Sequence, residues 1–130
     1  MPDRIDVKTT ARTVLIDITD QVAAYLRTQQ ATNGTLTLWS LHTTCALTVN
    51  EGYDPDVASD MTSFLNRLVP HDADFDHAEG NSDSHIKTSL FGPGLTLIIE
   101  NGELLLGRWQ RVYLAEFDGP RHREIAVLIR

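Results

Sequence analysis

Short stretches in which hydrophobic and polar residues alternate occur along most of the chain. Ile5 and Val7 alternate with polar neighbours near the N-terminus, and Val14, Ile16 and Ile18 repeat the pattern. A period of two residues is typical of strands that bury one face. The same pattern, with its flanking turn residues, predicts strands at residues 35–42, 46–51, 95–100, 103–106, 109–117 and 124–129. We therefore expect a chain built mostly from short strands.

Two longer segments have helical spacing instead. Residues 19–29 carry apolar side chains at intervals of three and four, which predicts a short helix. A second helix begins with Asp54 at the N-cap and Pro55 at the first helical position, and runs to about Leu68. A shorter helix over about residues 84–90, capped by Asp83 or Ser82, also agrees with the pattern.

Tight turn signals connect the predicted strands. Asn33-Gly34 and Asn101-Gly102 are typical of short hairpin turns. The 130 residues show no internal repeat or linker, so we expect a single domain over residues 1–130. The predicted fold is α+β and mostly β: an antiparallel sandwich or a partly closed, jelly-roll-like barrel with two principal helices.

Composition and charge exclude some classes of function. The net charge of −7 argues against non-specific binding to nucleic acid and against attraction to an anionic membrane. A single cysteine cannot form an intrachain disulfide, and no apolar run approaches the ~20 residues of a membrane span. These features predict a cytoplasmic protein. Arginines gather in the C-terminal part, which is compatible with a local site for a phosphorylated small molecule.

Three histidines lie in segments rich in Asn, Asp, Glu and Thr. His42 shares the strand parity of Leu36 and Leu38, so we expect it at the inner end of that strand. His77 and His85 belong to the polar loop and the short helix start that follow the second principal helix. Three imidazoles and a water form a typical open zinc site, so these histidines are candidate ligands.

The spacing alone leaves a structural interpretation open. Eight positions separate His77 from His85, which is neither the helical pair of zinc proteases nor a strand pair. For any single histidine, a solvated or hydrogen-bonded structural imidazole is the better explanation by about two to one. His71 and His122 fit that structural interpretation best, because one follows a helix-ending proline and the other lies between two arginines.

Three acidic residues, Glu51, Glu116 and Asp118, are candidates for moving protons. Glu116 has the parity of Val112 and Leu114, so its carboxylate should point inward. A buried carboxylate is either functional or paired with an arginine, and the sequence does not separate the two.

Other polar residues have simpler explanations beside the functional one. Asn50, Glu51, Asn81 and Asp83 could orient the imidazoles, although Asp83 could equally cap a helix. Arg121 has the forked donors that suit phosphate. Cys45 is better explained as a small buried residue than as a nucleophile.

Several of these residues occur together in motifs. The motifs are Leu41-His42-Thr43-Thr44, Val49-Asn50-Glu51 with Asp54-Pro55-Asp56-Val57, Gly80-Asn81-Ser82-Asp83-Ser84-His85, Leu106-Gly107-Arg108-Trp109-Gln110, and Glu116-Phe117-Asp118-Gly119-Pro120-Arg121. Taken in order across nearly the whole chain, they resemble the YjbQ-like family, which is usually described as secondary thiamine-phosphate synthase.

The resemblance implies a compact, mostly antiparallel β fold with helices, assembled as a homotrimer. It also implies a divalent metal, expected to be zinc, held by His42, His77 and His85. The other functional positions that it implies are Asn50, Glu51, Asn81, Asp83, Glu116 and Arg121. Two residues depart from the family pattern, Cys45 in place of another small residue and Arg108 in place of the more frequent threonine.

The leading hypothesis is therefore a metal-dependent enzyme that acts on a small phosphorylated metabolite. Its weak secondary activity would join a pyrimidine pyrophosphate to a thiazole phosphate. In this hypothesis the catalytic residues are Glu51, Glu116 and Asp83, and the ligand-binding residues are Asn50, Asn81 and Arg121. Two alternatives remain open: a hydrolase that uses a metal-activated water with Glu51 as base, and a non-catalytic trimeric module that binds metal or metabolite.

Overall fold

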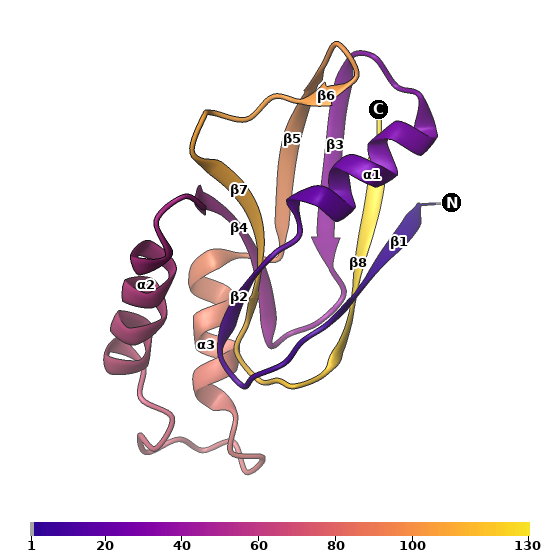
Figure 1. The fold of residues 1–130 in the computed structure, drawn as a ribbon. Coiled ribbons are helices and arrows are strands. Elements are labelled where there is room, and N and C mark those ends of the chain that lie inside the picture. The colour runs from indigo at the N-terminus through magenta and orange to yellow at the C-terminus, as the bar shows by residue number, and fades with distance from the viewer. Residues whose placement is uncertain (1) are drawn as a thin grey trace.

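The computed structural model describes residues 2–130, and in that part of the chain it contains eight strands and three helices (Figure 1). The strands are β1 (Asp3–Lys8), β2 (Val14–Asp17), β3 (Gly34–Ser40), β4 (Cys45–Glu51), β5 (Gly94–Glu100), β6 (Glu103–Leu104), β7 (Gln110–Glu116) and β8 (His122–Ile129). The helices are α1 (Thr19–Gln29), α2 (Pro55–Leu68) and α3 (Ser82–Phe91).

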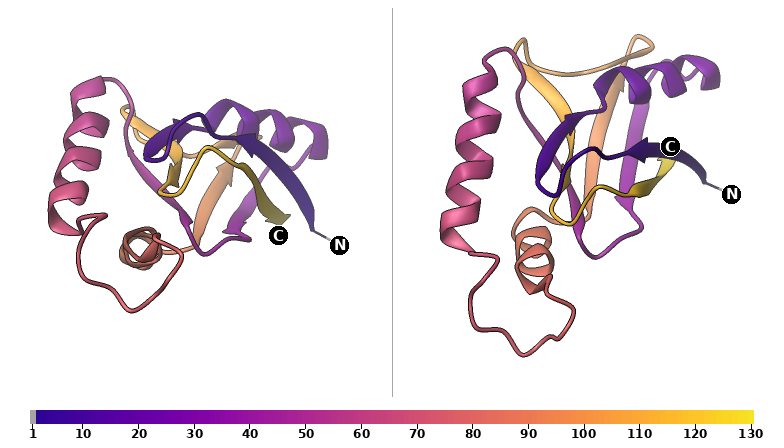
Figure 2. Two further views of the ribbon diagram at one scale, coloured as in Figure 1. Left: turned by 90° about the horizontal axis from the view of Figure 1, so that it is seen from below. Right: turned by 60° about the horizontal axis from the view of Figure 1, so that its bottom comes forward.

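The strands form two antiparallel sheets. One has five strands in the order β1-β8-β3-β5-β6, and the other has three in the order β2-β7-β4. The two termini lie near each other because β1 pairs with β8, with Asp3 opposite Val127 (Figure 2). The prediction of a mostly β, antiparallel fold with helices is confirmed.

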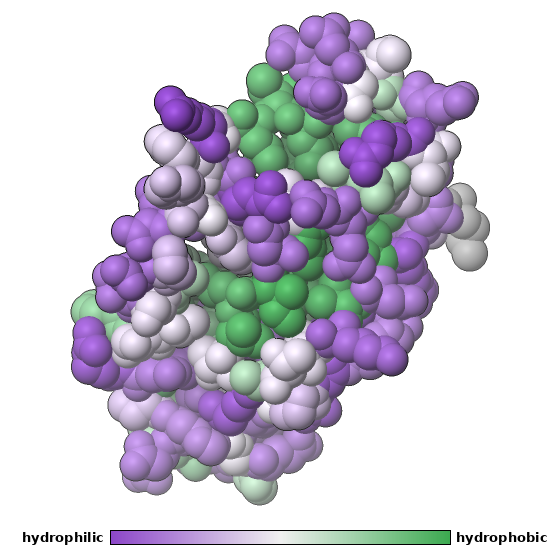
Figure 3. Space-filling model, viewed as in Figure 1, coloured by the Kyte–Doolittle hydropathy of each residue, from purple (hydrophilic) through white to green (hydrophobic). Residues whose placement is uncertain are grey.

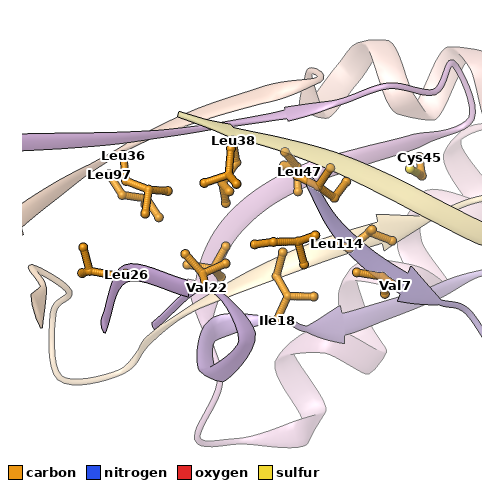
Figure 4. Packing of buried hydrophobic residues seen from close by; sticks show 14 of the residues in the cluster. Val7, Ile18, Val22, Leu26, Leu36, Leu38, Cys45, Leu47, Leu97 and Leu114 are labelled. Atoms are coloured by element: carbon orange, nitrogen blue, oxygen red, sulfur yellow. The ribbon is translucent and has the colours of Figure 1, made fainter. Parts of the chain in front are cut away.

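The main core lies between the sheets and beneath α1. Leu36 and Leu38 of β3 point to the same side, as their parity predicts, and face apolar side chains of α1 and of the second sheet (Figure 4). The facing side chains include Ile18, Val22, Leu26, Leu47 and Leu114. Helix α1 therefore begins and ends as its apolar spacing predicts.

Helices α2 and α3 lie together on the side of the three-stranded sheet, with α3 next to β4 (Figure 1). The start of α2 is as predicted, because Asp54 Oδ1 accepts the N–H of Asp56 at 2.9 Å and Pro55 follows it. Helix α3 is longer than predicted, and its N-cap residue is Asn81 rather than Asp83 or Ser82. It is a third full helix, where two principal helices were expected.

Strand β3 ends two residues earlier than predicted, so the placement of His42 in that strand is wrong. The cause is Ser40, whose Oγ accepts the N–H of His42 at 3.3 Å and donates to the carbonyl of Cys45 at 3.0 Å. These bonds turn the chain out of the sheet. His42 therefore lies in the loop between β3 and β4 and is partly buried. Ser40 is the last residue of β3 whose side chain points inward.

The surface that carries α1 is polar with two hydrophobic areas, one near β6 and one below α1 (Figure 3). Beside the first, a cavity of about 630 Å³ separates α1 from β6 and the segment after it, with Leu26, Leu104 and Leu106 among its lining residues. Among residues 2–130, no helix is long and apolar enough to span a membrane.

Candidate functional site

Three segments that are distant in sequence meet at one end of the sheets. They are the β3–β4 loop, the start of α3 with the residues before it, and the β7–β8 turn, all at the lower end in Figure 1. Together they line an open, solvent-facing cavity of about 340 Å³, a volume within the range of small-molecule sites. Its lining residues are Leu41, His42, Thr43, Thr44, Glu79, Asn81, His85, Asp118, Arg121 and Arg123.

His85 shares one cavity with each of the other two predicted metal ligands, His42 and His77. His42 and His85 line this cavity, whereas His77 and His85 line an adjoining one of about 400 Å³. The ring centroids of His77 and His85 are 5.4 Å apart, with the rings perpendicular. The polar loop after α2 thus brings two imidazoles side by side despite their unusual spacing.

His42 is held as a neutral imidazole. Burial and the nearby Arg123 guanidinium both lower its pKa. The backbone N–H of Glu124 donates to His42 Nε2 at 2.8 Å. A neutral imidazole has one lone pair, so the proton lies on Nδ1, which is left as a hydrogen-bond donor.

The three imidazoles have the chemistry that a zinc ion requires, but their positions do not form a complete ligand set. Neutral imidazole is the form that binds zinc. However, the lone pair of His42 already accepts the Glu124 N–H, and within residues 2–130 no three His, Cys, Asp or Glu side chains are arranged to hold an ion. The structure as it stands presents a histidine pair, and His42 would have to release Glu124 to complete a set of three.

The two histidines assigned a structural role lie outside the cavity. His71 Nε2 is 2.7 Å from the carbonyl oxygen of Gly80, and this contact closes the loop between α2 and α3. His122 is exposed on β8, with Nε2 3.3 Å from Asp6 Oδ1.

Glu116 points inward as its parity predicts, and it is fully buried in an ion pair. Its two carboxylate oxygens accept bonds from Arg123, Thr9 and the backbone N–H groups of Phe117 and Asp118. Burial alone would raise the pKa of Glu116, but these bonds hold it below its ordinary value. Arg123 also donates to Thr44 Oγ1 at 2.8 Å. The pair therefore joins the β7–β8 turn to the β3–β4 loop, and the ion-pair interpretation describes Glu116 better than proton transfer does.

Asp83 is also buried, away from the cavity. Arg12 donates two hydrogen bonds to its carboxylate, each of 3.0 Å, and Lys87 donates one of 3.1 Å. Burial opposes ionisation, yet the two cations lower the pKa of Asp83 to about 2. A carboxylate that stays ionised in this way is suited to fixing α3 rather than to moving protons, and Asp83 does not cap the helix.

Sequence reasoning missed the partners of Asp83. Lys87, only 1% exposed, also donates to Asn66 of α2 at 2.9 Å, so it ties the two helices together. Its position four residues after Asp83 was a usable signal for an ion pair on a helix. Arg12, 71 residues away in sequence, had no such signal.

Asn81 and Arg121 both reach the cavity, and both bind Asp118. Asn81 Nδ2 donates to Asp118 Oδ2 at 2.8 Å, and Arg121 donates to the same oxygen at 3.1 Å and to the Asp118 carbonyl at 2.7 Å. The bond to a carboxylate fixes which atom of Asn81 is nitrogen. It also explains why Asn81 makes no side-chain cap bond at the start of α3. Asp118 is thus the predicted proton handler that lies in the cavity.

Asn50 and Glu51 lie at the opposite end of β4. Six residue steps separate Glu51 from Cys45, which corresponds to about 20 Å along a strand. Neither residue lines the cavity, so a hydrolase with Glu51 as base is not assembled within one chain. Cys45 is fully buried and burial raises the pKa of its thiol, in agreement with a packing role.

Comparisons with known proteins agree with this fold over nearly its whole length. The model of the UPF0047 protein YjbQ-like family matches residues 3–130. A UPF0047 protein of Methanocaldococcus jannaschii is 44% identical over 126 residues, which cover 97% of this chain and 91% of that protein. The UPF0047 protein YugU of Bacillus subtilis is 43% identical, over 92% of this chain and 91% of its own length.

Solved structures give the same result. A protein of the YjbQ/UPF0047 family from Clostridium acetobutylicum has a TM-score of 0.96 and 41% identity, covering 98% of this chain and 99% of that one. A conserved hypothetical protein from Thermus thermophilus has a TM-score of 0.92 and 45% identity over the same shares. The chain belongs to the UPF0047 protein YjbQ-like family.

Proposed function

We propose that the cavity between the three segments is the active site of a metal-dependent enzyme that acts on a small phosphorylated metabolite. Weak thiamine-phosphate synthase activity is its proposed secondary reaction. The observation that carries the proposal is the convergence of His42, His85 and Arg121, from three separate segments, on one polar cavity.

Anion recognition follows from the donors at the cavity wall. Arg121 is oriented by its two bonds to Asp118, and its exposed side chain keeps further N–H donors for a phosphate. Joining the two thiamine precursors releases pyrophosphate, so donors fixed beside the departing group stabilise the charge that develops on it.

The proposed metal ligands are His42, His77 and His85. A bound divalent ion, with zinc expected, would act as a Lewis acid toward phosphate oxygens. Support comes from the adjacent rings of His77 and His85 and from the neutral state of His42. Among the acids, Asp118 lines the cavity and Glu51 does not, and its proposed role is to orient Arg121 and Asn81 toward the ligand.

Product formation from the two thiamine precursors tests the activity. We expect Arg121→Gln to lower the rate about a hundredfold, since it removes a charged donor to the leaving phosphate. Arg67→Gln is the matched control, because Arg67 lies on α2 over Phe64, away from the cavity. Equal rates in both variants and the wild type would contradict the assignment of Arg121.

Metal content tests the ligand set separately. We expect purified His85→Ala to lose its zinc, since His85 belongs to both histidine pairs, while His122→Ala keeps it. Mass spectrometry of the metal is paired with a thermal melt, so that a folded variant without metal is distinguished from an unfolded one. The same zinc content in His85→Ala and the wild type would refute the site.

A homotrimer is the proposed assembly. Strand parity points Trp39, Ile98 and Leu128 away from the core of the five-stranded sheet, and Trp39 and Ile98 are 51% and 54% exposed. Large apolar groups gathered on one sheet face are typical of an interface. Sedimentation equilibrium should give three times the mass of the chain, and a smaller mass for Trp39→Lys. A wild-type monomer would contradict this proposal.

A further inference from the structure

A separate cavity of about 350 Å³ lies at the other end of β4 and β7 from the candidate site. It is formed where the turn after β4 meets the segment before β7. Its lining residues are Asp17, Gly52, Tyr53, Arg108, Trp109 and Arg111. None of them belongs to the cavity that contains His42 and His85, so this second cavity needs its own explanation.

Two aromatic rings form one side of this cavity. The centroids of Tyr53 and Trp109 are 4.9 Å apart, with the rings tilted by 55°. Tyr53 is 77% exposed and Trp109 is 45% exposed. Rings of this size usually bury most of their apolar surface, so an exposed pair offers a stacking surface to a ligand.

An unpaired positive charge lies beside the rings. The guanidinium carbon of Arg108 is 4.6 Å from the Trp109 ring centroid, and within residues 2–130 Arg108 makes no ion pair or side-chain hydrogen bond. Arg111 differs, because Asp17 and Asp20 bind it at 2.7 and 3.2 Å. In a chain of net charge −7, Arg108 therefore keeps its donors available for an anion.

The floor of the cavity is fixed in place. The N–H of Gly52 donates to the carbonyl of Trp109 at 2.8 Å, which joins the two segments. A Cβ at Gly52 would lie 2.1 Å from Arg111 Cγ and 2.8 Å from Tyr113 Oη, so the close approach requires glycine. The backbone beneath the site is therefore held in place without a ligand, which lowers the entropic cost of ordering it on binding.

We propose that this cavity binds a small planar heteroaromatic anion. The ring of the ligand stacks on the exposed Tyr53, with the tilted Trp109 ring against its edge, and its carboxylate or phosphate accepts hydrogen bonds from Arg108. The volume is within the range of small-ligand sites. This site lies beyond the proposed active site and does not depend on it.

Calorimetric titration with uridine monophosphate tests the proposal, because this probe has both a planar base and a phosphate. We expect Tyr53→Ala and Arg108→Gln each to weaken binding about tenfold, corresponding to one stacking or ionic contact. Uridine and inorganic phosphate, each with half of the recognised chemistry, should bind more weakly than the nucleotide. Both altered side chains are on the surface, and a thermal melt checks that both variants remain folded.

Two further variants decide where the nucleotide binds. Arg67→Gln removes another arginine that stacks on an aromatic ring and should bind like the wild type. The titrations are repeated in the Arg121→Gln background, which removes the phosphate donor of the other cavity, so that the binding that remains reports on this cavity alone. The proposal is overturned if the wild type does not bind the nucleotide, if inorganic phosphate binds the Arg121→Gln protein as well as the nucleotide does, or if adding Arg108→Gln to that protein leaves nucleotide binding unchanged.

Discussion

Glu116→Gln should lower the free energy of unfolding by about 3–5 kcal/mol, as removal of one partner from a buried ion pair does. Arg123 is 3% exposed and directs its guanidinium at Glu116, so the variant leaves a buried charge with only neutral acceptors. Glutamine also presents an NH2 group where the carboxylate accepts the backbone N–H groups of Phe117 and Asp118. Urea unfolding at neutral pH measures the loss.

Glu124→Gln is the matched control for this experiment. Glu124 forms an exposed pair with Arg4 on the neighbouring strand, and water screens such a pair, so the variant should unfold almost like the wild type. Equal losses in the two variants would show that burial of the Glu116 pair is not the source of the effect.

The stability of the protein should also depend on pH through Glu116. Its pKa is lowered in the folded state, so the unfolded chain takes up the proton at higher pH than the folded one does. Its contribution is complete above the ordinary glutamate pKa of about 4.3 and is lost as the pH falls through the lower folded value. Urea titrations of wild type and Glu116→Gln should therefore converge as the pH falls, and a constant difference would contradict this explanation.

Asp83→Asn should destabilise the protein by a similar amount, about 3–5 kcal/mol. Asp83 is the common acceptor of Arg12 and Lys87, and Lys87 is almost fully buried. Without the carboxylate, the buried Lys87 has only neutral amide oxygens as acceptors, that of Asn66 among them. Because this network fixes α3, which carries His85, the variant should also bind zinc less tightly.

Urea unfolding and a zinc titration of the folded variant measure the two effects. Asp60→Asn makes the same chemical change on the exposed surface of α2 and should leave both unchanged. If Asp83→Asn unfolded like Asp60→Asn, the buried network would not be the anchor of α3.

Much of the fold was predictable because the local signals were strong. The alternation in β3, the Asp54-Pro55 start of α2 and the Asn101-Gly102 turn each specify a conformation within a few residues. The end of β3 was not predictable in this way. It depends on the bonds of Ser40 to the following loop and on the contact of Leu41 with Glu124, which lies in a distant strand.

The roles of the acidic residues were harder to predict than their positions. Parity placed Glu116 inside correctly, but only the structure shows that Arg123 and Thr9 surround it. Likewise, Arg12, which binds Asp83, follows β1 and is 71 residues away from Asp83 in the sequence. Ion pairs between distant segments leave no periodic signal, so buried acids with structural partners resemble catalytic acids in a sequence.

A crystal structure of the protein with zinc and pyrophosphate tests the proposed active site most directly. We expect an anomalous zinc peak beside His85 and pyrophosphate oxygens within hydrogen-bond distance of Arg121, in the cavity shared by the β3–β4 loop, α3 and the β7–β8 turn. Zinc bound away from His85, or pyrophosphate bound only outside this cavity, would contradict this proposal.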